Sequence, residues 1–332
     1  MTVVFFGSSG FSVPSLRSMR PLVVTVVTRK SKPKGRGRLL EDNEVKAEAL
    51  ALGLPIIEID SFKDEEAQSI ADLEADLFVV ASFGLIIPRR FLDLPAIGAL
   101  NVHPSLLPRY RGPAPIQWAI WSGERVTGIT VIGMNEKMDG GDILFREETV
   151  IGPDEDAEAL SERLSLRAAE ALLRVAGEAE KKGISHGIPQ NDEEATYTPM
   201  ITKEMGRIDW GAGAAEIVRK VRAFVQWPTA YTFLEGKMVK VFKARPGVRD
   251  LPPGYAPGCA PGCAPECAPE CAPECAPGCA PGSVLAVSAE GIEIAAGAGS
   301  VVLAEVQAEN RKRMAASDFA RGLRQISEKQ FK

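Results

Sequence analysis

An asparagine and a histidine stand two positions apart at the end of an apolar run. Residues alternate between the two sides of a β-strand, so Asn101 and His103 would project to one side while Val102 projects into the core. An amide that donates a hydrogen bond and an imidazole that carries a proton both stabilise a developing oxyanion, which indicates acyl-transfer chemistry. The alternative is a buried histidine that is satisfied by a backbone carbonyl.

A carboxylate in a glycine-rich turn favours the chemical interpretation. The sequence Met-Asp-Gly-Gly-Asp begins at Met138, and a turn of this kind lets Asp139 approach an imidazole and hold it oriented or protonated. Asp142 could fill the same role. Its alternative is a turn or cap residue before the strand predicted at 143–145.

The surrounding residues carry a resemblance to a known family. The run NVHPSLLPRYRGPAPIQWAIWSG (101–123) and the later MDGGDIL (138–144) resemble the 10-formyltetrahydrofolate-dependent formyltransferases, in which the aspartate also stands 38 positions after the asparagine. Similarity to the longer members, which act on charged initiator tRNA, extends from FFGSSGF near the N-terminus to the WPTAY segment and beyond.

The resemblance implies a direct transfer of the formyl group from 10-formyltetrahydrofolate to the α-amine of methionyl initiator tRNA. Asn101 and protonated His103 would stabilise the oxyanion of a tetrahedral intermediate, and Asp139 would orient and charge His103 and help to move the amine proton. Arg109 and Arg111 would lie near the folate or the acceptor. Two loops would hold the folate through Phe83, Gly84, Leu85, Ile86, Ser105, Leu106, Leu107 and Pro108.

A basic run from Arg29 to Arg38 holds six positive residues and no negative one. Such a run is usually a solvated turn. The resemblance instead implies that Arg36, flanked by Lys34 and Arg38, inserts near the acceptor end of the tRNA. Lys and Arg also outnumber Asp and Glu by ten to four over residues 195–249, so the C-terminal domain is expected to contact the tRNA backbone.

Short apolar runs alternate with helical patterns over the first part of the chain. This alternation predicts an α/β fold with a doubly wound, Rossmann-like parallel sheet, which we assign to a formyltransferase catalytic domain at 1–188. Residues 189–203 are expected to form a linker. The alternating strands that follow predict a small OB-like β-barrel that binds tRNA, at 204–332.

All six cysteines lie in a tetrapeptide repeat between Tyr255 and Gly282. Zinc ligand pairs usually have the spacing C-x2-C or C-x4-C, whereas here the spacing is C-x3-C, and a proline in every repeat prevents a helix that would align the thiols. We therefore predict a disordered insert at 256–282 that binds no metal. Replacing it by a brief glycine-containing turn should preserve folding and activity.

Composition limits the remaining choices. A chain of 332 residues has room for two domains, and a net charge of −5 argues against an overall basic nucleic-acid binder. No apolar stretch reaches the roughly 18 residues that span a bilayer, and the N-terminus lacks a signal peptide's basic segment. We expect a cytoplasmic monomer that binds neither a membrane nor a stable protein partner.

Three other functions compete with methionyl-tRNA formylation. A formyltransferase of the same superfamily could act on a small amine, either glycinamide ribonucleotide or an amino-sugar nucleotide. A non-enzymatic tRNA-binding protein would need the basic surfaces without the Asn-His-Asp set. A nicotinamide-dependent oxidoreductase would need the full G-x-G-x-x-G sequence, which the turn at 7–10 lacks.

Overall fold

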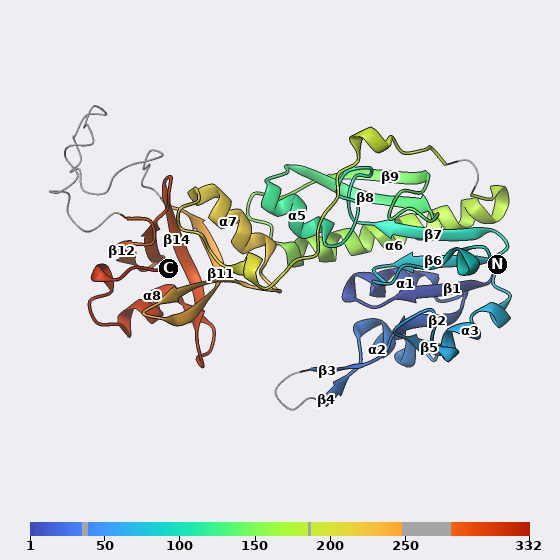
Figure 1. Ribbon diagram of the computed structural model, residues 1–332, viewed down its shortest axis with the longest axis horizontal. Helices are drawn as coiled ribbons and strands as arrows, with labels where there is room; N and C mark the ends of the chain where they lie inside the picture. The colour runs from blue at the N-terminus through green and yellow to red at the C-terminus, as the bar shows by residue number, and fades with distance from the viewer. Residues whose placement is uncertain (35–38, 185–186, 248–279) are drawn as a thin grey trace. The chain divides into compact units, whose positions relative to one another are not determined.

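The computed structural model describes residues 1–34, 39–184, 187–247 and 280–332 (Figure 1). The chain divides into two compact units. The first consists of residues 1–119, 125–152 and 159–200, and the second of residues 120–124, 153–158 and 201–332. Across the described ranges, no helix combines the length and the apolar character needed to cross a membrane.

The first unit is built on a seven-stranded sheet with the order β5-β2-β1-β6-β7-β8-β9. The strands are β1 (Val3–Gly7), β2 (Val23–Arg29), β5 (Ile56–Ile59), β6 (Leu77–Ala81), β7 (Gly98–His103), β8 (Val126–Gly133) and β9 (Ile143–Val150). The first five in this order are parallel and follow the Rossmann arrangement, which confirms the predicted α/β fold.

The last two strands of this sheet differ from the prediction, because β8 is antiparallel to β7 and β9 is antiparallel to β8. Only residues 134–142 join β8 to β9. A parallel pair needs a crossover of about a dozen residues or more, so this short connection forces the antiparallel pairing. The turn at 134–142 is the one that carries Asp139.

Apolar residues on both faces explain why the central strands are buried. All five residues of β1 and all five of β6 are buried, the pattern expected of strands covered on both sides. On one face Phe6 packs against Phe78 with ring centroids 5.0 Å apart. The helices that lie wholly or mostly in this unit are α1 (Val13–Met19), α2 (Glu44–Ala51), α3 (Glu65–Gln68), α4 (Arg89–Leu92), α5 (Pro115–Ser122) and α6 (Ala157–Lys182).

The glycine turn after β1 is bound to the loop after its neighbour β6. The Ser8 hydroxyl donates to the carbonyl oxygens of Ser82 and Phe83 at 2.9 and 3.0 Å, and the Ser9 hydroxyl donates to that of Ser82 at 2.8 Å. In the Rossmann arrangement, the order in which the chain adds strands to the sheet reverses between these two parallel neighbours. The turn therefore fixes the loop that carries four of the predicted folate contacts.

The predicted basic loop is based on a two-stranded hairpin, β3 (Lys32–Lys34) and β4 (Leu39–Glu41), in which Lys32 pairs with Glu41. Arg36 and Arg38 lie outside the described residues, and for Lys34 only the backbone is described. At the base of the hairpin, Arg29 forms an ion pair with Asp60 at 3.0 Å.

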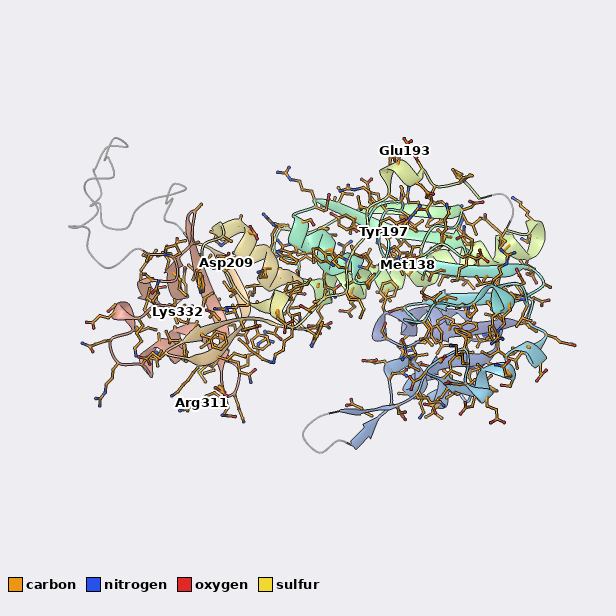
Figure 2. All side chains as sticks on the ribbon, viewed as in Figure 1. Met138, Glu193, Tyr197, Asp209, Arg311 and Lys332 are labelled. Atoms are coloured by element: carbon orange, nitrogen blue, oxygen red, sulfur yellow. The ribbon has the colours of Figure 1, made fainter. Side chains whose placement is uncertain are left out.

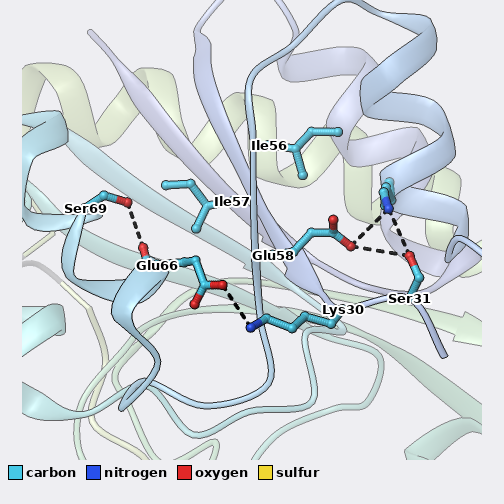
Figure 3. A pocket seen from close by; sticks show the side chains of 8 residues that line it. Lys30, Ser31, Ile56, Ile57, Glu58, Glu66 and Ser69 are labelled. Atoms are coloured by element: carbon cyan, nitrogen blue, oxygen red, sulfur yellow. Dashed lines mark hydrogen bonds and ion pairs between the residues drawn. The ribbon is translucent and has the colours of Figure 1, made fainter.

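A hollow beside edge strand β5 is lined by two lysines whose charges are already balanced (Figure 3). Lys30 bonds to Glu66 at 3.0 Å, and Lys46 bonds to Glu58 at 3.1 Å. The Ser31 hydroxyl accepts a further hydrogen bond from Lys46 at 2.9 Å. With both cations paired, this hollow does not have the unbalanced charge that would select an anionic ligand.

The second unit is an antiparallel sheet with the order β10-β11-β14-β13-β12, and β15 pairs with β14. Its core includes Trp210, Ile217 and Val241. The elements are α7 (Ala214–Ala223), β10 (Ala230–Leu234), β11 (Lys237–Pro246), β12 (Val284–Ser288), β13 (Gly291–Ala295), β14 (Ser300–Ala308), β15 (Met314–Ala315) and α8 (Ala316–Arg321). The predicted C-terminal β domain is confirmed, and the structure shows that its sheet is antiparallel.

Residues 329–332 join the two outer strands of this sheet. The backbones of Phe233, in β10, and Lys332 exchange two hydrogen bonds of 2.8 Å, and the amide of Val284, in β12, donates to the carbonyl of Lys329 at 3.3 Å. The segment thereby acts as a short strand between the edges. It closes the sheet into a barrel.

The cysteine repeat connects strands that are not neighbours, since β14 and β13 lie between β11 and β12. Most of the predicted insert, residues 256–279, lies outside the described residues. Its last residues belong to the barrel, because the amide of Gly282 donates to the carbonyl of Ala295 at 2.8 Å. A connection across three strand spacings covers about 14 Å, which residues 248–255 together with a brief turn are long enough to span, so the replacement stays a prediction with its end moved to leave Gly282 in the barrel.

We predict that a Gly/Ser linker of about eight residues in place of residues 248–279 leaves the Tm within a few degrees of the parent, because loop closure costs only about 0.6 kcal/mol per doubling of length. A two-residue linker spans at most about 7 Å and should lower the Tm sharply. Thermal unfolding with reductant present measures both. Equal Tm values for the two deletions would contradict the observed strand order.

Candidate active site

Strand β7 places the two predicted side chains on one side of the sheet. Asn101 is half-buried and His103 is 5% exposed, while Val102 between them is buried. β7 lies inside the sheet, where Asn101 is opposite Ile132 and His103 is opposite Thr130 of β8. The pair therefore stands on an internal, rigid strand.

The turn between β8 and β9 brings Asp139 to this pair. Its Oδ1 accepts a hydrogen bond from Asn101 Nδ2 at 3.3 Å, and its Oδ2 lies 3.6 Å from His103 Nδ1. Oδ2 also accepts from the backbone amide of Gly112 at 2.8 Å. Three side chains that are separated by up to 38 positions thus meet within hydrogen-bonding range or close to it. Asp142, the alternative carboxylate, has an exposed side chain.

A backbone carbonyl fixes the orientation of the histidine ring. His103 Nε2 lies 2.8 Å from the carbonyl oxygen of Tyr110. Because a carbonyl oxygen only accepts hydrogen bonds, Nε2 carries a proton in this arrangement, and Nδ1 is the nitrogen that faces Asp139. Both interpretations of His103 from the sequence are therefore met: its ring is satisfied by a carbonyl and also adjoins a carboxylate.

Residues 104–113, here called the proline loop, are tied to the sheet by Thr130. The Thr130 hydroxyl donates to the carbonyl of Ser105 at 2.7 Å and accepts from the amide of Leu107 at 3.2 Å. The Ser105 hydroxyl is bound to the carbonyl of Arg109 at 2.7 Å, and Leu107 is buried. These two predicted folate residues use their side chains to hold the loop, whereas Leu106 and Pro108 are half-buried.

The other predicted folate loop follows β6, the parallel neighbour of β7. Ala81 of β6 pairs with Val102, so Phe83 to Ile86 begin at the sheet edge where β7 ends. Phe83 is buried in an aromatic cluster, with its ring centroid 5.4 Å from that of Phe6. Gly84 adopts φ +76, Leu85 is half-buried and Ile86 is 75% exposed. Only the last two side chains are available at the surface.

Residues 188–198, here called the strap, lie along the proline loop and the Asp139 turn. The amide of Arg111 donates to the carbonyl of Thr196, and the amide of Thr198 donates to the carbonyl of Arg111, both at 2.8 Å. At the other end, Ile188 pairs with Ile143 through bonds of 2.9 and 2.8 Å. Residues predicted as part of a linker are thus bound to both loops of the site.

Arg111 has a different place from the one expected, because it is 1% exposed and binds the strap instead of a surface ligand. Its Nε and Nη2 donate to Gln190 Oε1 at 3.1 and 2.8 Å. Nη2 also donates to Asp192 at 2.9 Å, and Nη1 donates to the Tyr197 hydroxyl at 3.1 Å. A buried guanidinium needs such partners, and their residues lie about 80 positions along the chain, beyond the reach of local patterns. Arg109, in contrast, is exposed.

The strap is also tied to the Asp139 turn by charge. Lys137 bonds to Asp192 at 2.7 Å, and the pKa of the Asp192 carboxyl lies below its ordinary value because Lys137 and then Arg111 donate hydrogen bonds to it. This network leaves an apolar rim at the surface, where Met138 is 51% and Tyr197 is 64% exposed (Figure 2). Within the described ranges, no cluster of three or more His, Cys, Asp or Glu side chains could hold a metal ion.

Comparison with known families places both units. Residues 14–176 match the family described as "Formyl transferase", and residues 200–324 match "Formyl transferase, C-terminal domain". The chain is 40% identical over 330 residues to the methionyl-tRNA formyltransferase of Syntrophus aciditrophicus (strain SB), an alignment that covers 97% of this chain and 96% of the relative. It is 38% identical over 328 residues to that of Citrifermentans bemidjiense, covering 97% and 93%.

Solved structures share the fold at lower identity. HypX from Aquifex aeolicus in complex with tetrahydrofolic acid matches with a TM-score of 0.61 and 20% identity, over 96% of this chain and 46% of that one. The sugar 3N-formyl transferase WlaRD matches with a TM-score of 0.62 and 16% identity, over 94% and 99%. At these identities the likeness concerns the fold alone.

Proposed function

The chain belongs to the methionyl-tRNA formyltransferase family, and from this premise we propose that Asn101, His103 and Asp139 carry out its chemistry. Membership confirms the resemblance seen in the sequence and means that the enzyme formylates methionyl initiator tRNA with a formyl-tetrahydrofolate donor. The donor is 10-formyltetrahydrofolate in this proposal. The convergence of the three side chains on one another is the observation that carries the assignment.

The reaction proceeds by direct attack. The methionyl α-amine attacks the formyl carbon, a C–N bond forms, and the carbonyl electron pair moves onto the oxygen to give a tetrahedral oxyanion. Asn101 donates a hydrogen bond to this oxygen and protonated His103 donates a second through Nδ1, since Nε2 is engaged by Tyr110. The bond from carbon to N10 then breaks, and the folate nitrogen takes up a proton.

Asp139 has two functions in this scheme. Its carboxylate beside Nδ1 orients the His103 ring, and one carboxylate oxygen can receive the proton that the attacking amine loses. No covalent enzyme intermediate is required, because the acyl group passes between two substrates held together. The folate would bind at the sheet edge between the loop at 83–86 and the proline loop.

A substrate comparison tests the proposal. The enzyme, supplied with 10-formyltetrahydrofolate, should formylate charged initiator tRNA with a kcat/KM at least about 1000-fold above that for glycinamide ribonucleotide or an amino-sugar nucleotide, a difference of about 4 kcal/mol. If the enzyme prefers either small amine, then that amine is the acceptor in place of tRNA, and the proposed formyl-transfer chemistry still holds.

Two features support a tRNA acceptor. One is the run of six positive residues from Arg29 to Arg38 in the sequence. The other is on the barrel, where the rings of Tyr231 and Phe233 lie 5.8 Å apart and the guanidinium of Arg207 lies 5.8 Å from the Phe233 ring. Lys240 stands opposite Tyr231 across the strand pair. Aromatic faces beside cations suit stacked bases and a phosphate backbone.

We predict that Arg36→Ala lowers kcat/KM for charged tRNA by at least about tenfold, because one phosphate or acceptor contact is lost. Hydrolysis of the formyl donor without tRNA should be unchanged. Arg174→Ala removes an equal charge from a surface pair with Glu178 on α6 and serves as the control. If Arg36→Ala lowers both activities equally, the loop supports the folate site or the fold and does not contact the tRNA.

We propose that the enzyme acts as a monomer and in the cytoplasm. Asn101, His103, Asp139 and the residues that bind them all come from the same chain, so we propose a monomer. A reducing compartment also keeps the six cysteines as thiols.

A further inference from the structure

We propose that Gln190 is a positioning residue that aims the Asp139 carboxylate at His103. The inference rests on the proposed function, in which Asp139 acts on the histidine. Gln190 lies in the strap and touches none of the three proposed catalytic side chains. It acts on the backbone that carries one of them.

Gln190 spans the two loops of the site with a single amide group. Its Nε2 donates to the carbonyl of Asp139 at 2.8 Å and to that of Gly141 at 2.7 Å, so both of its N–H groups hold the turn. Its Oε1 accepts two hydrogen bonds from Arg111, whose side chain is buried. A rotation of the amide by 180° would face donors to donors and acceptors to acceptors, so its orientation is fixed.

The turn needs such a restraint. Asp139 adopts φ +48, in the left-handed region that costs a residue with a side chain free energy unless its surroundings hold it there. In this conformation the side chain reaches the Gly112 amide, Asn101 and His103. A relaxation of φ to the right-handed side would swing the carboxylate away from all three. Gln190 binds the carbonyls on either side of Gly140 and so opposes that relaxation.

A second tie from the strap adds to the first. Asp192 is bonded both to Arg111 and to Lys137, which stands two residues before Asp139. The turn is thus held before and after Asp139 by residues of one short segment. Asp192 and Lys137 are half or more exposed, so their contact is screened by solvent, whereas the bonds of Gln190 are part-buried and its Oε1 faces the buried Arg111.

Gln190→Glu separates the two halves of this contact. The glutamate can still accept hydrogen bonds from Arg111 but has no N–H for the carbonyls of Asp139 and Gly141. We expect kcat to fall about 10- to 100-fold, the KM for 10-formyltetrahydrofolate to change less than about twofold, and the Tm to stay near that of the parent. Gln190→Met removes both halves and should lower both kcat and the Tm. Glu193→Gln, an exposed change on the same strap, should leave kcat unchanged.

A double-mutant cycle distinguishes positioning from general support. If Gln190 acts through Asp139, then Gln190→Glu has little further effect on kcat in an Asp139→Asn background. A full 10- to 100-fold loss in that background, a normal kcat in Gln190→Glu, or a rise in KM without a fall in kcat would each overturn the inference. If the proposed role of Asp139 is itself wrong, the outcome is distinguishable, because Asp139→Asn alone would then keep the kcat of the parent.

Discussion

Asp139→Asn is expected to lower the kcat of formyl transfer by about 100-fold or more, which corresponds to about 2.7 kcal/mol of barrier, while folate binding is largely retained. An amide cannot take the proton from the attacking amine, and it cannot replace the carboxylate oxygen that faces Nδ1 of His103. It also has one acceptor oxygen in place of two, whereas Asn101 and the Gly112 amide both donate to the aspartate. Single-turnover formyl transfer to charged tRNA measures the chemical step.

Asp142→Asn is the matched control, because it makes the same chemical change three residues away. The side chain of Asp142 is exposed, and the hydrogen bond that this residue makes to the Gly133 amide comes from its backbone carbonyl. Its kcat should stay within about twofold of the parent. A near-normal kcat for Asp139→Asn together with a large loss for Asp142→Asn would transfer the catalytic role to Asp142.

Gly141→Ala is the second change with a large expected effect, because the turn has no room for a methyl group there. A Cβ at this position would lie 1.8 Å from the carbonyl oxygen of Gly133 and 3.4 Å from the Cα of Met134, both of which are backbone atoms that cannot rotate away. The turn must move by more than 1 Å to relieve this contact, and Asp139 moves with it. A misplacement of that size costs about 100-fold in kcat/KM.

The same change should lower the Tm by several degrees, because the first bonds between β8 and β9 lie beside the turn. Gly177→Ala is the control, since nothing lies within 4 Å of a Cβ added at this position in α6. Alanine is favoured over glycine in a helix by about 0.5 to 1 kcal/mol, so this variant should keep its activity and melt at the same or a higher temperature. Parent-like activity in Gly141→Ala would show that the turn tolerates movement.

The positions of the central strands and of Asn101 and His103 on one side of β7 could be predicted because their signals are local. The apolar run at 77–81 and the Asn-Val-His sequence at 101–103 show their burial and side-chain alternation within a few residues. The glycine-rich turn that carries Asp139 has an equally local signature. The choice of Asp139 over Asp142 followed from the family resemblance, which supplies long-range information that composition and periodicity lack.

Features set by distant partners could not be predicted. Arg111 looks like a surface arginine in a proline-rich loop, and only Gln190, Asp192 and Tyr197, about 80 positions later, make it a buried one. The strap has no hydrophobic period, so its polar composition resembled that of a linker. β11 and β12 are separated because β14 and β13 lie between them, and the sequences of β11 and β12 contain no signal for this arrangement.

The closure of the barrel by residues 329–332 sets an order on folding during synthesis. Every residue of the first unit precedes Ile201, so its sheet can assemble while the ribosome is still translating the second unit. The second unit cannot complete its barrel in this way, because the backbones of Phe233 in β10 and Val284 in β12 lack these partners until Lys329 to Lys332 have left the exit tunnel. While residues 329–332 are still in the tunnel, the nascent chain combines a folded first unit with an incomplete second sheet, and it should depend on chaperones most at that stage.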